Sequence, residues 1–311
     1  MTRHFLEIDD VAPAELASIL QFASTPHRRV LDGHGVALVM GLPSARTRNS
    51  TEMAVVDLGG HPVAMSGAEL GIDSRETAED VARTLAQYHR VLCARLPDHG
   101  VLVRMAAAID EAGLDVPVVN LLSDQGHPVQ ALADLLTLAG VAGGIASLAG
   151  SRVAWVGDAN NVAMSLGLAA VGVGLHVVVA SPEGYRFSQG DLARIDRYAA
   201  AAGMGGTVSQ ADHPADAVGG AIAVCTDVWV SMGQEREREA RLAAFEPFRV
   251  DGSLLDAAGD GVVLLHCLPA HRGEEVTDEV LEDRRSRVWA QAANRRVAMR
   301  GLLTWLVEEA R

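Results

Sequence analysis

Short apolar runs alternate with helix-length segments along this chain, and this alternation restricts the fold more than any other feature. In the first half, runs rich in apolar and β-branched residues occupy positions 36–40, 63–65, 91–95 and 117–120. Segments long enough to form helices, such as 76–87 and 102–112, separate these runs. The pattern predicts an α/β fold in which helices flank both faces of a parallel sheet.

The same alternation starts again after a break in the middle of the chain. A predicted helix at 127–139 leads into the stretch 140–150, which is rich in Gly and Ala and almost without charge. A second set of apolar runs follows at 152–156, 175–179, 206–209, 221–224 and 261–265. The sequence therefore predicts two similar domains, with a helical C-terminal segment that packs back across the seam. Their expected bounds are 1–140, 141–288 and 289–311.

The charge of the chain limits its partners. Its 311 residues carry a formal net charge of -14, which repels nucleic acid and acidic membrane surfaces. Every basic residue is an arginine, since the sequence contains no lysine. Schiff-base chemistry and a Walker-type phosphate loop both need a lysine, so neither is expected. An anionic ligand must be held by a local group of arginines.

The cysteines and the apolar segments predict a protein of a reducing compartment that does not span a membrane. Cys93, Cys225 and Cys267 are widely spaced and odd in number, which favours neither a disulfide framework nor a metal-binding knuckle. The first residues become acidic at once and lack the apolar stretch of a secretory signal, so the cytoplasm is expected. The apolar stretch 162–181 contains two glycines, which divide it into a buried helix and a buried strand rather than a membrane span.

The sequence Pro-Ser-Ala-Arg-Thr-Arg, which follows the first predicted strand, is a candidate anion site. It precedes a helix expected at 49–58. Backbone N–H groups at a helix start attract anions, and the hydroxyls of Ser44 and Thr47 add donors. The guanidiniums of Arg46 and Arg48 have the bidentate geometry that suits phosphate. A polar helix cap with solvated arginines is the alternative.

Three further polar residues follow the next strands of the first half. Arg95 ends one predicted strand, while His127 and Gln130 open the helix that follows another. An arginine, an imidazole and an amide that converge there could polarise a carbonyl group. Otherwise, a lone histidine at such a position is a helix cap.

In the second half, two loops offer groups for a zwitterionic ligand. Gly-Asp-Ala-Asn-Asn at 157–161 lacks the glycine spacing of a dinucleotide-binding loop, and its amides and carboxylate suit an amino acid better. Asp227 offers a carboxylate for an amine, Ser231 a hydroxyl for a carboxylate, and Gly233 a flexible hinge. The charged run 235–241 is expected to be a solvated helix face.

The sequence His-Cys-Leu-Pro at 266–269 directly follows the apolar run 261–265. Ligands of open α/β folds bind beyond the carboxyl ends of the strands, so a thiol, an imidazole and a Pro-stiffened backbone stand in a functional place. A buried cysteine beside a histidine with its hydrogen bonds satisfied is the alternative.

Taken together, these stretches resemble the aspartate/ornithine carbamoyltransferase family, specifically ornithine carbamoyltransferases of the actinobacterial type, over essentially the whole chain. The most specific segments are 227–234, which is similar to the Ser-Met-Gly ornithine loop, and 266–273, His-Cys-Leu-Pro-Ala-His-Arg-Gly. The aspartate-using relatives have neither. The resemblance implies transfer of a carbamoyl group from carbamoyl phosphate to the δ-amine of L-ornithine, without a metal or organic cofactor. The products would be L-citrulline and phosphate, in arginine metabolism.

The resemblance also implies a carbamoyl-phosphate domain first, an ornithine domain second, and a cytoplasmic homotrimer with sites between subunits. Carbamoyl phosphate would be bound by Ser44, Arg46, Thr47, Arg95, His127, Gln130, Cys267, Leu268 and Arg295. Ornithine would be bound by Asn161, Asp227, Ser231 and Met232. The residues that would act directly in catalysis are Arg95, His127 and Cys267.

The phosphate loop departs from the family pattern. Ala45 stands where the family has a threonine, Leu42 where it has a lysine, and Glu69 is the counterpart of a glutamine that reaches the neighbouring subunit's carbamoyl phosphate. Lost hydrogen bonds and an added negative charge predict weaker binding of carbamoyl phosphate. Two alternatives follow: a carbamoyltransferase for another amine, or a non-catalytic relative that binds ornithine or a protein partner.

Overall fold

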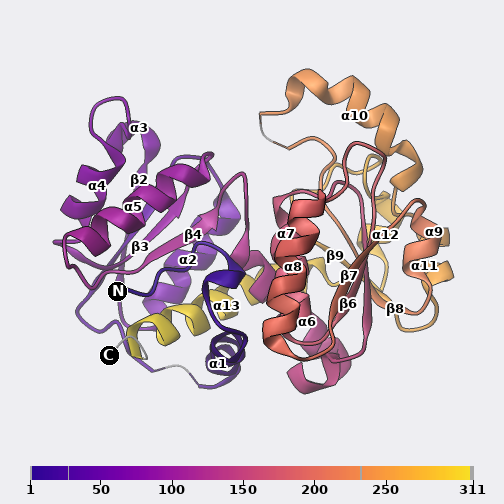
Figure 1. Ribbon diagram of the computed structural model, residues 1–311, viewed down its shortest axis with the longest axis horizontal. Coiled ribbons are helices and arrows are strands. Elements are labelled where there is room, and N and C mark those ends of the chain that lie inside the picture. Colours follow the sequence, from indigo (N-terminus) through magenta and orange to yellow (C-terminus); the bar gives the residue numbers. More distant parts are fainter. Residues whose placement is uncertain (1, 27, 232, 309–311) are drawn as a thin grey trace. The chain divides into compact units, whose positions relative to one another are not determined.

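The computed structural model describes residues 2–26, 28–231 and 233–308 (Figure 1). The chain forms two compact units. The first unit contains Met1–Ala133 and Ala293–Arg311, and the second contains Asp134–Ala292. The units therefore divide inside two helices, α6 (Pro128–Ala142) and α13 (Val288–Glu308), and each of these helices contributes to both units.

The first unit is built on a parallel sheet of β1 (Gly35–Met40), β2 (His61–Ser66), β3 (His89–Arg95) and β4 (Val118–Leu122). The strand order is β2-β1-β3-β4, so the chain leaves β1 first to one side and then to the other. Parallel sheets bind ligands where the strand order reverses in this way, beyond the carboxyl ends of the strands. Here that place is between β1 and β3, where Met40 is the register partner of Arg95.

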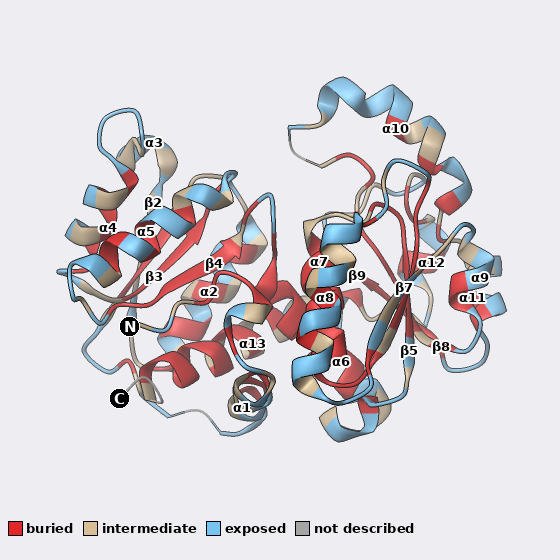
Figure 2. Ribbon diagram, viewed as in Figure 1, coloured by how far each residue is buried: buried red, intermediate tan, exposed pale blue. Residues whose placement is uncertain are grey.

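Helices cover this sheet, and most residues of β1, β3 and β4 are buried, whereas the edge strand β2 is half-buried (Figure 2). Helices α4 and α5 pack on one apolar cluster with the sheet, which includes Val81, Leu92, Leu102 and Met105. The C-terminal helix α13 packs against α1, as expected for a segment that returns to the first half of the chain. The helices of this unit, besides parts of α6 and α13, are α1 (Pro13–Ser24), α2 (Ala45–Asp57), α3 (Gly67–Leu70), α4 (Ala78–Leu85) and α5 (His99–Glu111).

The second unit has a parallel sheet of order β7-β6-β5-β8-β9. Its strands are β5 (Arg152–Val156), β6 (His176–Ala180), β7 (Thr207–Ala211), β8 (Ala221–Thr226) and β9 (Val263–His266). Here the strand order reverses between β5 and β8, so the loops that follow these two strands meet. Its helices, besides parts of α6 and α13, are α7 (Asn161–Gly172), α8 (Gln189–Ala202), α9 (Pro214–Val218), α10 (Arg238–Phe245), α11 (Gly252–Ala258) and α12 (Asp278–Glu282).

The predicted fold class is confirmed: two parallel sheets flanked by helices, with a returning C-terminal helix. The apolar stretch 162–181 is indeed a helix and a strand, and every residue of α7 from Val162 to Gly172 is buried. None of the helices in the described parts of the chain is both long and apolar enough to cross a membrane. The helix expected at 49–58 was placed too late, because Ser44 caps α2 and the helix begins at Ala45.

Gly301 lets α13 approach α1 closely, and we expect Gly301→Ala to destabilise the protein. An added Cβ would lie 2.6 Å from the backbone N of Ala23 and 2.6 Å from the backbone O of Ile19, and neither atom can move alone. The free energy of unfolding should fall by about 1–3 kcal/mol, as for other overpacked cores. Urea unfolding measures this change.

The matched control is Gly140→Ala, also inside a helix. Among the described residues, no atom lies within 4 Å of a Cβ added there. Alanine has the higher helix propensity, so this variant should gain up to about 1 kcal/mol. Equal stability of the two variants would contradict the close contact of α1 with α13.

Candidate functional site

The polar residues singled out in the sequence gather at the carboxyl ends of the strands, in one cluster in each unit. The cluster of the first unit, here called the anion cluster, consists of Ser44, Arg46, Thr47, Arg95, His127, Gln130 and Arg295. The cluster of the second unit, here called the acceptor cluster, contains Asn161, Asp227, Ser231, Cys267 and Leu268. Met232 lies outside the described residues.

The side chain of Thr47 is the centre of the anion cluster. Its Oγ1 accepts a hydrogen bond from Arg95 Nη1 at 3.2 Å and another from Arg295 Nη2 at 2.8 Å. Thr47, Arg95 and Arg295 are all buried, and Thr47 and Arg295 are 248 residues apart in the sequence. Two guanidiniums therefore converge on one buried hydroxyl, which makes this place strongly attractive to an anion.

The local backbone explains why these groups meet. The N–H groups of Gly41 and Leu42, just beyond β1, donate to the carbonyl oxygen of Arg95 at the end of β3, at 2.9 and 3.3 Å. This contact holds the loop that leads into α2 beside Arg95. Ser44 then caps α2, because its Oγ accepts a hydrogen bond from the Thr47 N–H at 3.2 Å. The positive end of the helix dipole adds to the charge of the arginines.

The two neighbouring arginines of α2 differ in their surroundings. Arg48 is exposed and its Nε pairs with Glu52 at 2.8 Å, one turn further along the helix. Arg46 is half-buried in the first turn, and it makes no hydrogen bond or ion pair with the residues that the structure describes. Arg48 is thus paired within α2, and the expectation that both guanidiniums serve the anion site stays a prediction.

His127 lies at the start of α6 and is buried. Burial, followed by the charges of Arg295 and Arg95, lowers the pKa of His127 well below its ordinary value of 6.5. The imidazole is therefore neutral at physiological pH, so that one ring nitrogen can donate a hydrogen bond while the other accepts. Gln130 is also buried, and its backbone N–H donates to the carbonyl oxygen of His127 at 3.0 Å.

The three departures in the phosphate loop leave the fold of the loop intact. Ala45 is exposed at the first position of α2, and Leu42 is half-buried. Glu69 belongs to a capping box at the start of α3, where its Oε2 accepts from the Ser66 N–H at 2.6 Å. This hydrogen bond lowers the pKa of Glu69, so the side chain stays ionised. Its carboxylate is used by its own helix.

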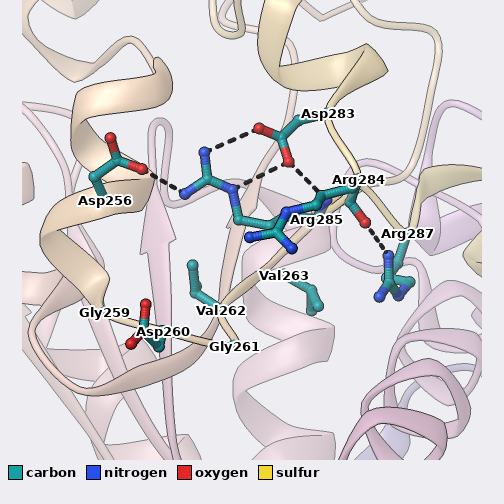
Figure 3. A pocket seen from close by; sticks show the side chains of 10 residues that line it. All are labelled: Asp256, Gly259, Asp260, Gly261, Val262, Val263, Asp283, Arg284, Arg285 and Arg287. Atoms are coloured by element: carbon teal, nitrogen blue, oxygen red, sulfur yellow. Dashed lines mark hydrogen bonds and ion pairs between the residues drawn. The ribbon is translucent and has the colours of Figure 1, made fainter.

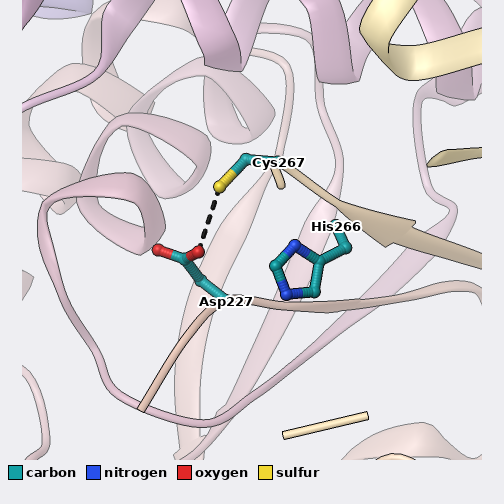
Figure 4. A group of neighbouring side chains, drawn as sticks. All are labelled: Asp227, His266 and Cys267. Carbon is teal, nitrogen blue, oxygen red and sulfur yellow. Dashed lines mark hydrogen bonds between the residues drawn. The ribbon is translucent and has the colours of Figure 1, made fainter. Parts of the chain in front are cut away.

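The acceptor cluster is centred on the Asp227 carboxylate, just beyond β8. Its Oδ2 accepts a hydrogen bond from Asn160 Nδ2 at 2.9 Å, and its Oδ1 accepts one from the Cys267 thiol at 3.0 Å (Figure 4). Three loops, which follow β5, β8 and β9, therefore meet at one buried carboxylate.

Asn160, one of the two amides noted in the loop 157–161, is the one that touches Asp227. Its Oδ1 also caps α7 by accepting hydrogen bonds from the N–H groups of Val162 and Ala163. Asn161, the predicted ligand-binding residue, is the first residue of that helix. A cap residue and the residue after it point in different directions, and the sequence pattern could not separate the two.

The turn after β9 has an unusual backbone that a buried network supports. Leu268 has φ of +60°, a region that non-glycine residues rarely adopt, and a cis peptide bond joins it to Pro269. His266 Nδ1 accepts from the Leu268 N–H at 2.9 Å, and His266 Nε2 lies 3.0 Å from Glu275 Oε1. The His266 N–H donates to Gln291 Oε1 at 2.8 Å. Both ring nitrogens of His266 are therefore occupied, so this histidine supports the turn that presents Cys267.

The region after Asp227 differs from the expectation. The run 235–241 was predicted to be a solvated face, but Arg241 on α10 is buried. Its Nη2 pairs with the Asp158 carboxylate, its Nε donates to the carbonyl oxygen of Trp229, and its guanidinium lies over the Tyr185 ring. Arg241 thus joins the loop after β5 to the loop after β8. Ser231 is half-buried, and its N–H donates to Gln234 Oε1 at 2.9 Å.

A separate pocket of about 410 Å³ lies near the start of β9, at the other end of the strand from Cys267 (Figure 3). The pairs of Arg285 with Asp256, at 2.6 Å, and with Asp283, at 2.9 Å, neutralise much of its charge. None of the residues predicted to bind substrate lines this pocket.

Comparison with known proteins agrees with this division of the site. Residues 3–140 match the carbamoyl-P binding domain of aspartate/ornithine carbamoyltransferases, and residues 149–306 match the Asp/Orn binding domain of the same family. The chain is 45% identical over 318 residues to the ornithine carbamoyltransferase of Acidothermus cellulolyticus, covering 100% of this chain and 98% of that relative. It is 43% identical to the ornithine carbamoyltransferase of Mycolicibacterium gilvum, covering 99% of each.

A solved structure is similar as well. The ornithine carbamoyltransferase of Pyrococcus furiosus has a TM-score of 0.89 and 40% sequence identity, covering 97% of this chain and 96% of that one. The likeness therefore extends through both units.

We expect Arg241→Met to destabilise the protein, because it leaves the Asp158 carboxylate buried without its cation. Burial already raises the pKa of Asp158, with Arg241 opposing that shift. Breaking a buried ion pair costs about 3–5 kcal/mol, which urea unfolding near pH 8 would measure as a lower free energy of unfolding.

The matched control is Arg272→Met, which removes an exposed guanidinium paired with Asp278 and Glu282 and should change stability little. The double variant Arg241→Met, Asp158→Asn should recover part of the loss, because no charge is left buried. A stability of Arg241→Met equal to wild type would show that Asp158 does not need this partner.

Proposed function

Since this chain belongs to the aspartate/ornithine carbamoyltransferase family, we propose that its two clusters bind the two substrates of an ornithine carbamoyltransferase. The enzyme transfers the carbamoyl group of carbamoyl phosphate to the δ-amine of L-ornithine, which gives L-citrulline and phosphate. The observation that carries this proposal is the convergence of Arg95 and Arg295 on Thr47, beside an arginine, Arg46, that pairs with no described residue.

The anion cluster binds carbamoyl phosphate in this proposal. The phosphate takes the helix start of α2, with Ser44, Thr47 and Arg46, and Arg95, Gln130 and Arg295 complete the site. A dianion is well matched to guanidiniums in fork geometry. The hydrogen bonds that Thr47 now accepts from the two arginines hold them in place before the substrate arrives, which reduces the entropy lost on binding.

The acceptor cluster binds ornithine. Asp227 faces the α-amino group as the counter-ion, while Ser231 and Asn161 take the remaining polar groups together with Met232. Asn160 and the Cys267 thiol hold the Asp227 carboxylate by hydrogen bonds at 2.9 and 3.0 Å. Cys267 and Leu268 steer the δ-amine toward the carbonyl carbon, on a turn whose backbone His266 and Glu275 support.

The chemistry needs a neutral amine and a stabilised oxyanion. The nitrogen lone pair of ornithine attacks the carbonyl carbon of carbamoyl phosphate, and negative charge grows on the carbonyl oxygen. Arg95, neutral His127 and Thr47 donate hydrogen bonds to that oxygen. The C–O bond to phosphate then breaks, phosphate leaves as an anion among the arginines, and the amine loses its proton to give citrulline.

A carbamoyltransferase for another amine, and a non-catalytic ornithine-binding relative, are the alternatives. For acceptors without a free α-amino group, such as putrescine or acetylornithine, the Asp227 carboxylate would have no partner, although it is buried and held at both oxygens. The second has no need of buried cationic and imidazole groups in the anion cluster. Both are distinguished from the proposal by the assay below.

We further propose that the enzyme works as a cytoplasmic homotrimer. The first unit exposes Met53 and Val56 on α2, side by side at a spacing of three residues, next to the half-buried edge strand β2. An exposed apolar strip of this kind suits contact with a second copy of the chain. Light scattering coupled to gel filtration measures the mass of the particle, which should be that of three chains.

The cysteines support the cytoplasmic part of this proposal. The thiol of Cys267, which donates a hydrogen bond to Asp227, favours a reducing compartment.

Citrulline formation with a panel of amines tests the function. Purified protein with carbamoyl phosphate should turn over ornithine, and not putrescine, lysine, acetylornithine or aspartate. Turnover of a different amine alone would favour the first alternative. Binding of ornithine without any turnover would favour the second.

The variants Arg46→Ala and Arg48→Ala form a matched pair for the same assay. They remove neighbouring guanidiniums of one helix, and only that of Arg46 is left without an internal partner among the described residues. Arg46→Ala should lower kcat/KM by about a hundredfold or more, the usual cost of a lost transition-state donor. Arg48→Ala should stay near wild type. Equal effects of the two would contradict the assigned role of Arg46.

The rate should rise with pH between about 7 and 9. The ornithine δ-amine has a pKa near that of a lysine side chain, about 10.4, so each pH unit raises its neutral fraction about tenfold. His127 stays neutral throughout, because its pKa lies well below 6.5, and adds no falling limb. Measurement of kcat/KM for ornithine at saturating carbamoyl phosphate tests this; a flat profile would contradict attack by a neutral amine.

A further inference from the structure

A second group of polar side chains lies on the turn just after the Cys267 loop, and the proposed reaction does not use it. His271, Glu274 and Glu275 each offer a ligand atom, and these atoms lie within 4.8 Å of one another. The turn that carries them is fixed by two backbone hydrogen bonds, from Glu274 N–H to the His271 carbonyl and from Gly273 N–H to the Val276 carbonyl. We call these three residues the turn cluster.

Glu275 is the anchor of the turn cluster, because its side chain is completely buried. Its Oε1 accepts a hydrogen bond from the His271 N–H at 2.6 Å and lies 3.0 Å from His266 Nε2. Its Oε2 is buried too, yet it has no hydrogen-bond partner within residues 2–26, 28–231 and 233–308. A buried carboxylate oxygen without a donor is costly and needs an explanation.

The other two members of the turn cluster share this property. His271 Nδ1 and Glu274 Oε2 are buried atoms, and neither has a hydrogen-bond partner in the described chain. They lie 3.6 Å apart, too far for a hydrogen bond but close enough to form an ion pair when His271 is protonated. The other oxygen of Glu274, Oε1, pairs with Arg238, whose side chain is largely exposed. Each member of the turn cluster therefore has one buried nitrogen or oxygen atom without a hydrogen bond in the described chain.

We propose that the turn cluster binds a divalent transition-metal ion of the zinc type through the imidazole of His271 and the carboxylates of Glu274 and Glu275. Zinc bonds to nitrogen and oxygen ligands measure about 2.0–2.2 Å, so tetrahedral ligands lie roughly 3.2–3.6 Å apart. The separation of His271 Nδ1 from Glu274 Oε2 already matches that value. One imidazole and two carboxylates suit zinc or cobalt, and water from the exposed side of His271 supplies the fourth ligand.

The ion stabilises the turn that supports the acceptor loop. Glu275 also bonds to His266, and the His266 Nδ1 receives the N–H of Leu268 in its strained conformation. A cation on Glu275 Oε2 fixes this carboxylate as the oriented acceptor for His266 Nε2, in the way that outer partners orient metal ligands elsewhere. The ion takes no part in carbamoyl transfer.

Titration of chelator-treated protein with Co²⁺ tests the proposal. We expect one equivalent to bind, with visible d–d absorption of a nitrogen and oxygen site, and Zn²⁺ to displace it. The thermal unfolding temperature should rise with the logarithm of the free Zn²⁺ concentration once this exceeds the dissociation constant. In His271→Ala and Glu274→Gln, which leave the buried Glu275 in place, the affinity for Co²⁺ should fall at least about tenfold.

Matched controls separate the turn cluster from other ligands. His213→Ala and Glu282→Gln remove exposed groups of the same kinds elsewhere in the second unit, and both should bind Co²⁺ like wild type. Unchanged binding in His271→Ala or Glu274→Gln would overturn the proposal. So would a thiolate-to-cobalt absorption band that Cys267→Ser removes, because the ion would then sit at Asp227 and Cys267. The absence of any binding or thermal shift in folded protein would overturn it as well.

Discussion

The convergence of Arg95 and Arg295 on the hydroxyl of Thr47 is the interaction on which the donor half of the site depends. Two like charges held in a buried place repel each other, and the same field is felt by His127, whose pKa both arginines lower. The packing of the sheet and of α13, which carries Arg295, stabilises this arrangement of the two arginines. A bound phosphate dianion reduces the repulsion between the two arginines, so the binding of substrate stabilises this part of the protein.

The acceptor cluster buries a carboxylate, whereas the anion cluster buries guanidiniums, and it must hold that carboxylate in a fixed orientation. Asp227 does this with donors from two other loops, Asn160 and Cys267. A second buried carboxylate, Asp158, is held by Arg241. The chain carries a net charge of -14, yet its buried arginines Arg95, Arg295 and Arg241 gather where an anion or a buried carboxylate is bound. Local charge, rather than total charge, therefore decides which ligands this protein can hold.

The sequence predicted the fold well, because parallel strands buried on both faces are read directly from their apolar runs. It also predicted that polar residues at strand ends would gather. It did not show that Asn160, rather than Asn161, bonds to Asp227, and it failed where a residue is buried by a distant partner. Arg241 looks like one charge in a solvated run, and only its contact with Asp158, 83 residues earlier, explains its burial. The support of the 266–269 turn by Glu275, nine residues after His266, was also missed, because no regular spacing marks a contact across an irregular turn.

The absence of lysine has a consequence beyond phosphate recognition. Carbamoyl phosphate is an electrophile toward any neutral primary amine, and a lysine near its binding site would be a competing acceptor. A guanidinium has no lone pair available at physiological pH, since it remains protonated. With arginine as its only basic residue, the chain offers the reagent no side-chain amine at all. The enzyme therefore has no lysine side chain that the compound it handles could carbamoylate.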